Sequence, residues 1–176
     1  GFKVALGTLA GAALYDWILA QDFTELDVDA RCAAWSAPAH FSGVIRRAFS
    51  NPALAESAVE ETLGAYPSTS ALRDRLEHLR AQWPELRERL RSHLVRAPEL
   101  RRMMQQASCA TTPEEVGLTR AELAGSYARA RLIRGRYTVL SFAAELGVLE
   151  EGVRHLFAAG GFWDTGIGEP GPDARL

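Results

Sequence analysis

The chain has 176 residues, and its 20 Lys and Arg against 22 Asp and Glu give a formal net charge of -2 at pH 7. A chain of this length fits one domain, which buries about 70% of the surface that its unfolded form exposes. The two signs of charge are interspersed, so we expect no basic face for a polyanion and no nucleic-acid partner.

The first predicted helix covers residues 3–21 and is apolar almost throughout. Its apolar run from Val4 to Ala20 is short for a membrane span and contains Asp16, so we predict a buried helix and no membrane span. Gly7 and Gly11 stand one turn apart, and each is about 1 kcal/mol less favourable in a helix than alanine. Their presence predicts that another helix packs closely against this face.

Two shorter helices follow in the predicted order. The first covers residues 28–36 and is expected to end at Pro38, because proline cannot continue a helix. The second covers residues 53–65, where Asn51 is a suitable N-cap and Pro52 suits the first helical position.

The clearest amphipathic segment begins at Ser70. Apolar residues recur there at alternating spacings of four and three, which predicts one stripe facing a core or a partner helix. The opposite face carries Glu and Arg and is predicted to be solvated. Pro84 removes a backbone donor, so we expect a kink or a short break near it. The stripe consists of Leu72, Leu76, Leu79, Trp83, Leu86 and Leu90.

The next segment contains a short predicted helix over residues 98–106, which Pro98 opens. Thr112 with Glu115, and Thr119 with Glu122, then have the spacing of a capping box. The sequence therefore predicts two helix starts close together.

The last helices and the tail complete the predicted fold. The helix from residue 119 is expected to stop near Gly135 and the next to start with Thr138 as its cap. Residues 161–176 are rich in Gly, Pro and acid, which predicts a flexible tail after a single helical domain at residues 1–160. No alternating run predicts a strand, so the expected fold class is an all-α multi-helix bundle of roughly seven to nine helices.

Side chains that bind metals are few and scattered. None of the four histidines has the i, i+4 spacing with a nearby acid that marks a helical metal site, and His40 is expected in a loop. Cys32 and Cys109 are far apart, which predicts neither a disulfide nor a zinc knuckle and suits a reducing cytoplasm. We therefore expect no catalytic residue, no metal site and no cofactor site in this chain.

The best candidate for binding chemistry is the segment around Arg134 and Arg136. Two guanidinium groups that flank a glycine at a helix junction can hold a substrate phosphate, because their forked donors match its oxygens. In the alternative, which the residues alone favour, Arg134 caps its helix, Arg136 pairs with an acid and Tyr137 packs.

Three segments in order resemble the C-terminal half of sn-glycerol-1-phosphate dehydrogenases, particularly the bacterial arabinose-operon-associated branch. They are Gly1-Phe-Lys-Val-Ala-Leu-Gly-Thr8, Cys109-Ala-Thr-Thr-Pro-Glu-Glu-Val-Gly-Leu118 and Arg134-Gly-Arg-Tyr-Thr-Val-Leu140. Segment 40–106 is less recognisable, and its assignment rests on the helix pattern alone. The resemblance implies a dehydroquinate synthase-like fold within the iron-containing alcohol dehydrogenase superfamily.

The resemblance implies an enzyme of phospholipid metabolism that interconverts dihydroxyacetone phosphate and sn-glycerol 1-phosphate with NADH or NADPH and a zinc or nickel ion. In that family a metal-binding histidine directly precedes the segment that corresponds to Gly1–Thr8. The resemblance therefore implies that the metal ligands and the nucleotide-binding domain belong to a missing N-terminal part. That part is an expected partner of this chain. The other expected partners are a small phosphorylated substrate and a second copy in a homodimer. The isolated chain is expected to be inactive.

Two alternatives remain open at this point. The chain is a free-standing helical binding or regulatory module, or it is the same domain of a glycerol dehydrogenase or dehydroquinate synthase. The first is disfavoured because the chain opens on its core helix without a cap residue before Lys3.

Overall fold

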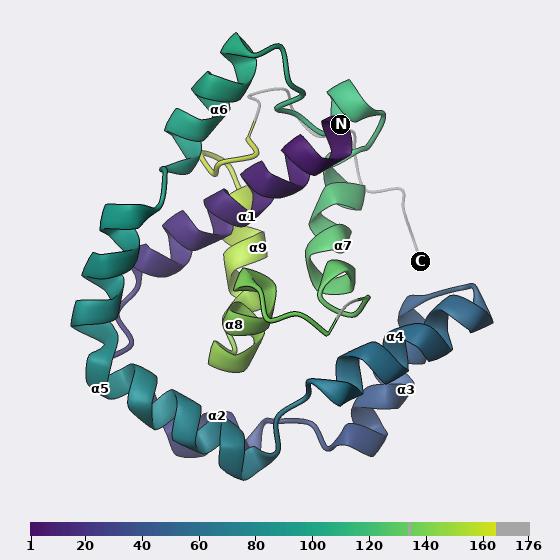
Figure 1. Ribbon diagram of the computed structural model, residues 1–176, viewed down its shortest axis with the longest axis vertical. Coiled ribbons are helices and arrows are strands. Elements are labelled where there is room, and N and C mark those ends of the chain that lie inside the picture. Colours follow the sequence, from purple (N-terminus) through teal and green to yellow (C-terminus); the bar gives the residue numbers. More distant parts are fainter. Residues whose placement is uncertain (134, 165–176) are drawn as a thin grey trace.

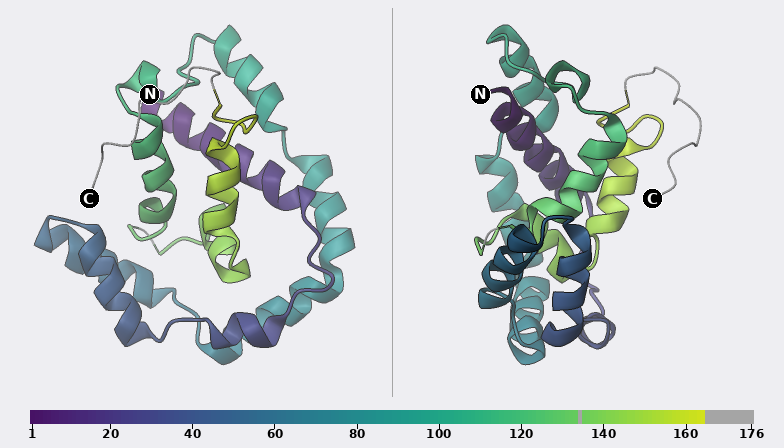
Figure 2. Two further views of the ribbon diagram at one scale, coloured as in Figure 1. Left: turned by 180° about the vertical axis from the view of Figure 1, so that it is seen from behind. Right: turned by 90° about the vertical axis from the view of Figure 1, so that its right-hand side faces the viewer.

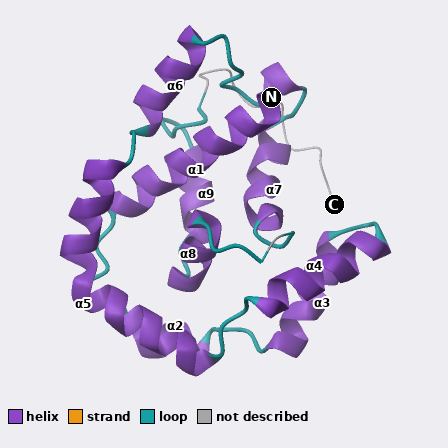
Figure 3. Ribbon diagram, in the orientation of Figure 1, coloured by secondary structure: helices purple, strands orange, loops and turns teal. Residues whose placement is uncertain are grey.

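The computed structural model describes residues 1–133 and 135–164, and it consists of helices joined by loops (Figures 1 and 3). No strand occurs within these two ranges, so the predicted all-α class is confirmed. The elements in chain order are α1 Phe2–Ala20, α2 Val28–Ala33, α3 Pro38–Ala48, α4 Pro52–Gly64, α5 Thr69–His93, α6 Ala97–Gln106, the 3-10 turn η1 Glu114–Val116, α7 Arg120–Ala130, α8 Val139–Leu146 and α9 Leu149–Phe157.

Helix α1 is the centre of the main core, and it contacts α5, α6, α8 and α9. By length and composition alone it is apolar enough to cross a membrane, a test that the core helix of a soluble protein also passes. That it does not span a membrane therefore stays a prediction. Its buried side chains are Leu6, Leu9, Ala10, Ala13, Leu14, Trp17, Ile18 and Leu19.

The predicted close packing at Gly7 and Gly11 is wrong. Counting the described residues, a Cβ at Gly7 would have no atom within 4 Å, and one at Gly11 would have only Val139 Cγ1 at 3.9 Å, an ordinary contact. The close approach lies at Gly152 of α9, where a Cβ would be 2.8 Å from the Trp17 ring. Because α1 packs on α9 through its bulky face, its glycine face is left open.

Helix α5 follows the predicted stripe. Leu72, Leu76 and Trp83 are buried, and the other three stripe residues pack partly buried against the same core. Pro84 lies inside one continuous helix, so the predicted break is absent, but Figure 1 shows that α5 changes direction part way along. A bend without a break is the expected effect of losing one backbone hydrogen bond.

The charged face of α5 does more than face solvent. Arg91 donates to the carbonyl of Leu19 at 2.6 Å, and Arg80 donates to that of Leu26 at 3.3 Å. Arg73 also pairs with Asp29 of α2 at 2.7 Å. The prediction of a purely solvated face therefore needs correction, since its arginines hold the connection between α1 and α2.

The sequence did not predict the helix α3. Pro38, which was expected to end a helix, stands at the first position of α3, and His40 lies exposed in this helix instead of in a loop. Helices α3 and α4 form a hairpin that Figure 2 shows projecting from the rest of the chain. The hairpin has its own small core, which consists of Phe41, Ile45, Ala58 and Leu132.

Three of the four predicted N-caps stand at the start of a helix. Asn51 Oδ1 accepts from Leu54 N at 3.2 Å, Thr119 and Glu122 form the capping box that begins α7, and Thr138 is the N-cap residue of α8. The fourth, Thr112 with Glu115, gives only the 3-10 turn η1, where the Glu115 carboxylate accepts the N–H groups of Thr111 and Thr112. These two bonds lower the pKa of Glu115.

The main core extends beyond the predicted boundary at residue 160. Trp163 is 2% exposed, and its Nε1–H donates to the Tyr127 hydroxyl at 3.0 Å. That hydroxyl donates in turn to the carbonyl of Ala10 at 3.1 Å. Residues 161–164 therefore belong to the domain, whereas the rest of the predicted tail, 165–176, lies outside the described residues.

Candidate anion-binding site

The segment that joins α7 to α8, described at residues 131–133 and 135–138, brings the candidate Arg136 to the site. The connection is fixed at Leu132, which is buried in the hairpin core and whose carbonyl accepts from Thr62 Oγ1 at 2.8 Å. Gly135 N–H donates to Glu61 Oε2 at 2.9 Å, and a Cβ at Gly135 would lie 3.0 Å from the Glu61 carbonyl oxygen. A glycine is thus needed where the connection passes along α4.

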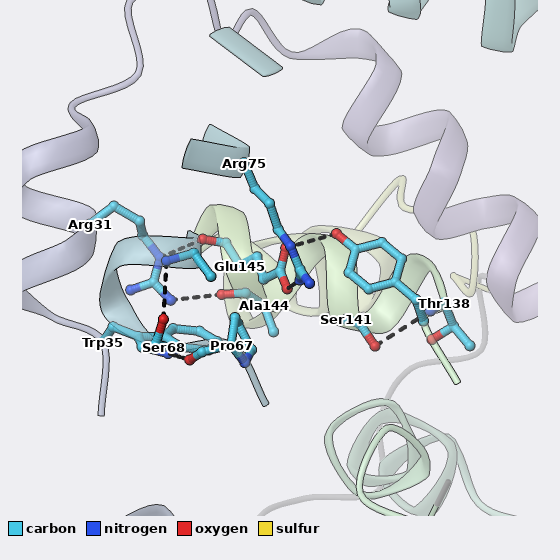
Figure 4. A network of polar contacts seen from close by, with 11 residues as sticks. Arg31, Trp35, Pro67, Ser68, Arg75, Thr138, Ser141, Ala144 and Glu145 are labelled. Atoms are coloured by element: carbon cyan, nitrogen blue, oxygen red, sulfur yellow. Dashed lines mark hydrogen bonds and ion pairs between the residues drawn. The ribbon is translucent and has the colours of Figure 1, made fainter. Parts of the chain in front are cut away.

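Glu145 of α8 is the acceptor for two side chains on another side of the candidate site (Figure 4). Its side chain is 7% exposed, and Arg75 Nη1 lies 2.7 Å from its Oε1. The Tyr137 hydroxyl donates to its Oε2 at 2.9 Å. Burial of the hydroxyl end and the adjacent carboxylate both raise the pKa of Tyr137, so this hydroxyl stays protonated and donates.

Arg31 of α2 binds the end of α8. Its Nε donates to the carbonyl of Glu145 at 2.8 Å, and its Nη2 donates to that of Ala144 at 2.7 Å. These carbonyls belong to the last turn of α8, where the helix leaves acceptors unpaired and its dipole favours a cation. Gly147 ends the helix in the left-handed region with φ 79°, which side chains rarely adopt.

A stack of aromatic rings forms a third wall and ends in an arginine on each side. Trp35 and Tyr66 stack with centroids 4.7 Å apart, and Tyr66 stacks on Phe41 at 4.8 Å. Arg31 lies over Trp35 at 5.3 Å, and Arg131 lies over Phe41 at 5.0 Å. Burial, and then the charge of Arg31, lower the pKa of Arg131, but an arginine remains protonated at neutral pH.

These walls line a pocket of about 520 Å³, to which Arg75, Arg131 and Arg136 contribute together with Glu145, the single acid of its lining in the described part of the chain. Arg75 forms an ion pair with Glu145. Within residues 1–133 and 135–164, neither the Arg131 nor the Arg136 side chain has a hydrogen bond or an ion pair, and Arg131 lies over the Phe41 ring and near Tyr66 and Arg31. Among these residues the pocket therefore carries excess positive charge and two guanidinium groups without an acid partner.

Of the two residues predicted to bind phosphate, Arg136 is among the described residues and Arg134 is not. Arg136 lines the pocket and lacks, among the described residues, the acid partner that the structural alternative gave it. Arg134 lies outside the described residues. Tyr137 is more than half exposed and contributes its hydroxyl to Glu145.

Four residues of the site were not found from the sequence: Arg31, Arg75, Arg131 and Glu145. Of these four residues, Arg131 is the one whose place in the sequence could have indicated the site, because it is close to the predicted pair Arg134 and Arg136. Arg31 is 114 residues away in sequence from its acceptor in α8, and Arg75 is 70 residues away from Glu145. No spacing rule detects such pairs.

The described part of the chain contains no group of three or more His, Cys, Asp or Glu that could hold a metal ion. These residues therefore provide no ligand set for the zinc or nickel ion that the resemblance implies.

Comparison with protein-family models found no matching family, and comparisons with curated proteins and with solved structures found no match.

Proposed function

We propose that Arg131 and Arg136 bind the phosphate group of a small phosphorylated substrate. The single observation that supports this is that both guanidinium groups line one pocket in which Glu145, the only lining acid among the described residues, is paired with Arg75. A guanidinium presents forked donors that match phosphate oxygens, and bonds to a charged group are stronger than neutral ones. The Arg75–Glu145–Tyr137 contacts would hold the wall against which the substrate lies.

We further propose, from the resemblance in three segments, that the substrates are dihydroxyacetone phosphate and sn-glycerol 1-phosphate. In this proposal the chain is the substrate-side domain of an NAD(P)-dependent metal dehydrogenase. The nucleotide, the zinc or nickel ion and hydride transfer belong to the missing nucleotide-binding part, and the present residues bind and orient the phosphate end. The chain alone is expected to be inactive.

Isothermal titration of the 176-residue chain with sn-glycerol 1-phosphate tests the phosphate site. Arg136→Ala should weaken binding by about tenfold or more, because a hydrogen bond to a charged group contributes roughly 1.5 to 3 kcal/mol. Arg89→Ala is the matched control, since it removes the same charge from an exposed position on α5. Equal affinities of the two variants would refute the proposal.

The exposed start of α1 favours the second candidate, a helical binding module. Phe2 is 64% exposed and Val4 is 71% exposed, which suits contact with another protein. A chain that binds neither phosphorylated substrate would favour this module. Glycerol bound as tightly as sn-glycerol 1-phosphate would instead favour a glycerol dehydrogenase domain, because the phosphate would then contribute nothing.

A further inference from the structure

A second hollow lies beside the phosphate pocket. It is an apolar groove of about 400 Å³ between α1, α7 and the start of α8, and its size is that of a small-molecule site. Ala10, Leu123, Val139 and Leu140 supply its aliphatic lining.

Gly7 and Gly11 keep this groove open. Both line it, and a Cβ at either position would meet no crowded atom. Each glycine makes α1 less stable than alanine would, and no helix of residues 1–133 or 135–164 packs closely here to offset that loss. The missing side chains leave space in the groove, although small residues alone do not say what fills it.

The charged residues in the lining of the groove limit its occupant. Arg131 and Arg136 line this groove as well as the phosphate pocket, so two cationic groups meet an aliphatic surface. Two polar side chains of the lining already have partners, since the Ser126 hydroxyl donates to the Glu122 carbonyl and the Tyr127 hydroxyl donates to that of Ala10. An occupant that complements this surface is anionic at one end and aliphatic along the rest.

We propose that the groove binds a monoalkyl phosphate, with its phosphate at Arg131 and Arg136 and its alkyl chain along Gly7 and Gly11. The inference rests on the proposed function for its phosphate end alone. The alkyl chain gains affinity by leaving water, and each fully buried methylene group tightens binding by about fourfold.

Titration of the 176-residue chain with octyl phosphate, inorganic phosphate and octanol separates the two contributions. All ligands are kept below the concentration at which octyl phosphate forms micelles, as checked by light scattering. Octyl phosphate should bind at least about a hundredfold more tightly than inorganic phosphate, because several methylene groups are buried. Octanol should bind more weakly than octyl phosphate, because it has no charge for the arginines.

Gly7→Leu tests the groove without damaging the fold. Leucine is a better helix former than glycine, so the melting temperature should stay equal or rise, while the new side chain fills the groove. The variant should lose most of the octyl advantage and keep its affinity for inorganic phosphate. Thr8→Leu is the control, because it adds the same bulk at an exposed position of α1 outside the groove.

The outcomes distinguish the two proposals. If Arg136→Ala weakens phosphate binding but the octyl chain adds nothing, or its advantage survives Gly7→Leu, the groove proposal fails and the phosphate site stands. If Arg136→Ala leaves the affinity for phosphate unchanged, the proposed function fails, and the monoalkyl phosphate proposal fails with it. A concentration-dependent dimer that Gly7→Leu dissociates would assign the groove to a second copy and overturn the proposal.

Discussion

Arg75 and Glu145 join α5 to α8 through an ion pair of 2.7 Å in which the carboxylate is almost completely buried and the guanidinium is half exposed. Tyr137 donates to the second oxygen of the same carboxylate. The pair thus fixes one wall of the pocket and leaves the guanidinium groups of Arg131 and Arg136 as its free cations among the described residues.

Glu145→Ala should destabilise the fold, because it leaves the Tyr137 hydroxyl and Arg75 without their acceptor. We expect the free energy of unfolding to fall by about 1 to 3 kcal/mol, since the half-exposed Arg75 can be rehydrated. Urea denaturation measures the change. Glu60→Ala, at an exposed position on α4, should stay within about 0.5 kcal/mol, and a Glu145 variant as stable as this control would contradict the role of the pair.

Trp163→Ala should be among the most damaging substitutions. The ring is buried against Phe157 and Phe162, and its N–H donates to Tyr127. Truncating a buried tryptophan costs about 3 to 5 kcal/mol, so the melting temperature should fall by well over 5 °C. A shift of less than 1 °C in differential scanning calorimetry would place Trp163 outside the core.

Two leucines of α5 provide a graded test of its stripe. Leu76 is 2% exposed, whereas Leu79 packs partly buried against the same core. Leu76→Ala should cost about 2 to 5 kcal/mol, and Leu79→Ala should cost less because less of its side chain leaves water on folding. Equal losses in urea denaturation, or a larger loss at Leu79, would mean that the stripe is rotated relative to the core.

Tyr66 makes the stability of the hairpin depend on alkaline pH. Burial raises its pKa from 10.0 to about 12. The folded chain therefore keeps a proton that the unfolded chain loses, so this contribution is complete below pH 10 and disappears as the pH rises through about 12. Melting temperatures from pH 9 to pH 12 should fall less steeply in Tyr66→Phe than in the unmodified chain, and parallel curves would contradict the effect.

Local signals in the sequence predicted the helices well. Asn51 with Pro52, and Thr119 with Glu122, identified two helix starts because a cap depends on residues within one turn. Pro38 misled for the same reason, since a proline suits the first position of a helix as well as the end of the preceding one.

Features that depend on distant residues were not accessible. The glycine that admits a close neighbour is Gly152, but which helix packs on it depends on how α1 and α9 meet. The site shows the same limit. Arg136 was found from its local spacing, whereas Arg75 and Glu145 become partners only when α5 lies beside α8.

NMR titration of the isotopically labelled chain with sn-glycerol 1-phosphate tests whether phosphate binds at Arg131 and Arg136. We expect the largest chemical-shift changes on the backbone amides of residues 131–133 and 135–138 and on the two guanidinium groups, and we expect these changes to disappear in Arg136→Ala. Saturable shifts confined to another part of the chain, or shifts that persist unchanged in Arg136→Ala, would show that phosphate does not bind at these arginines.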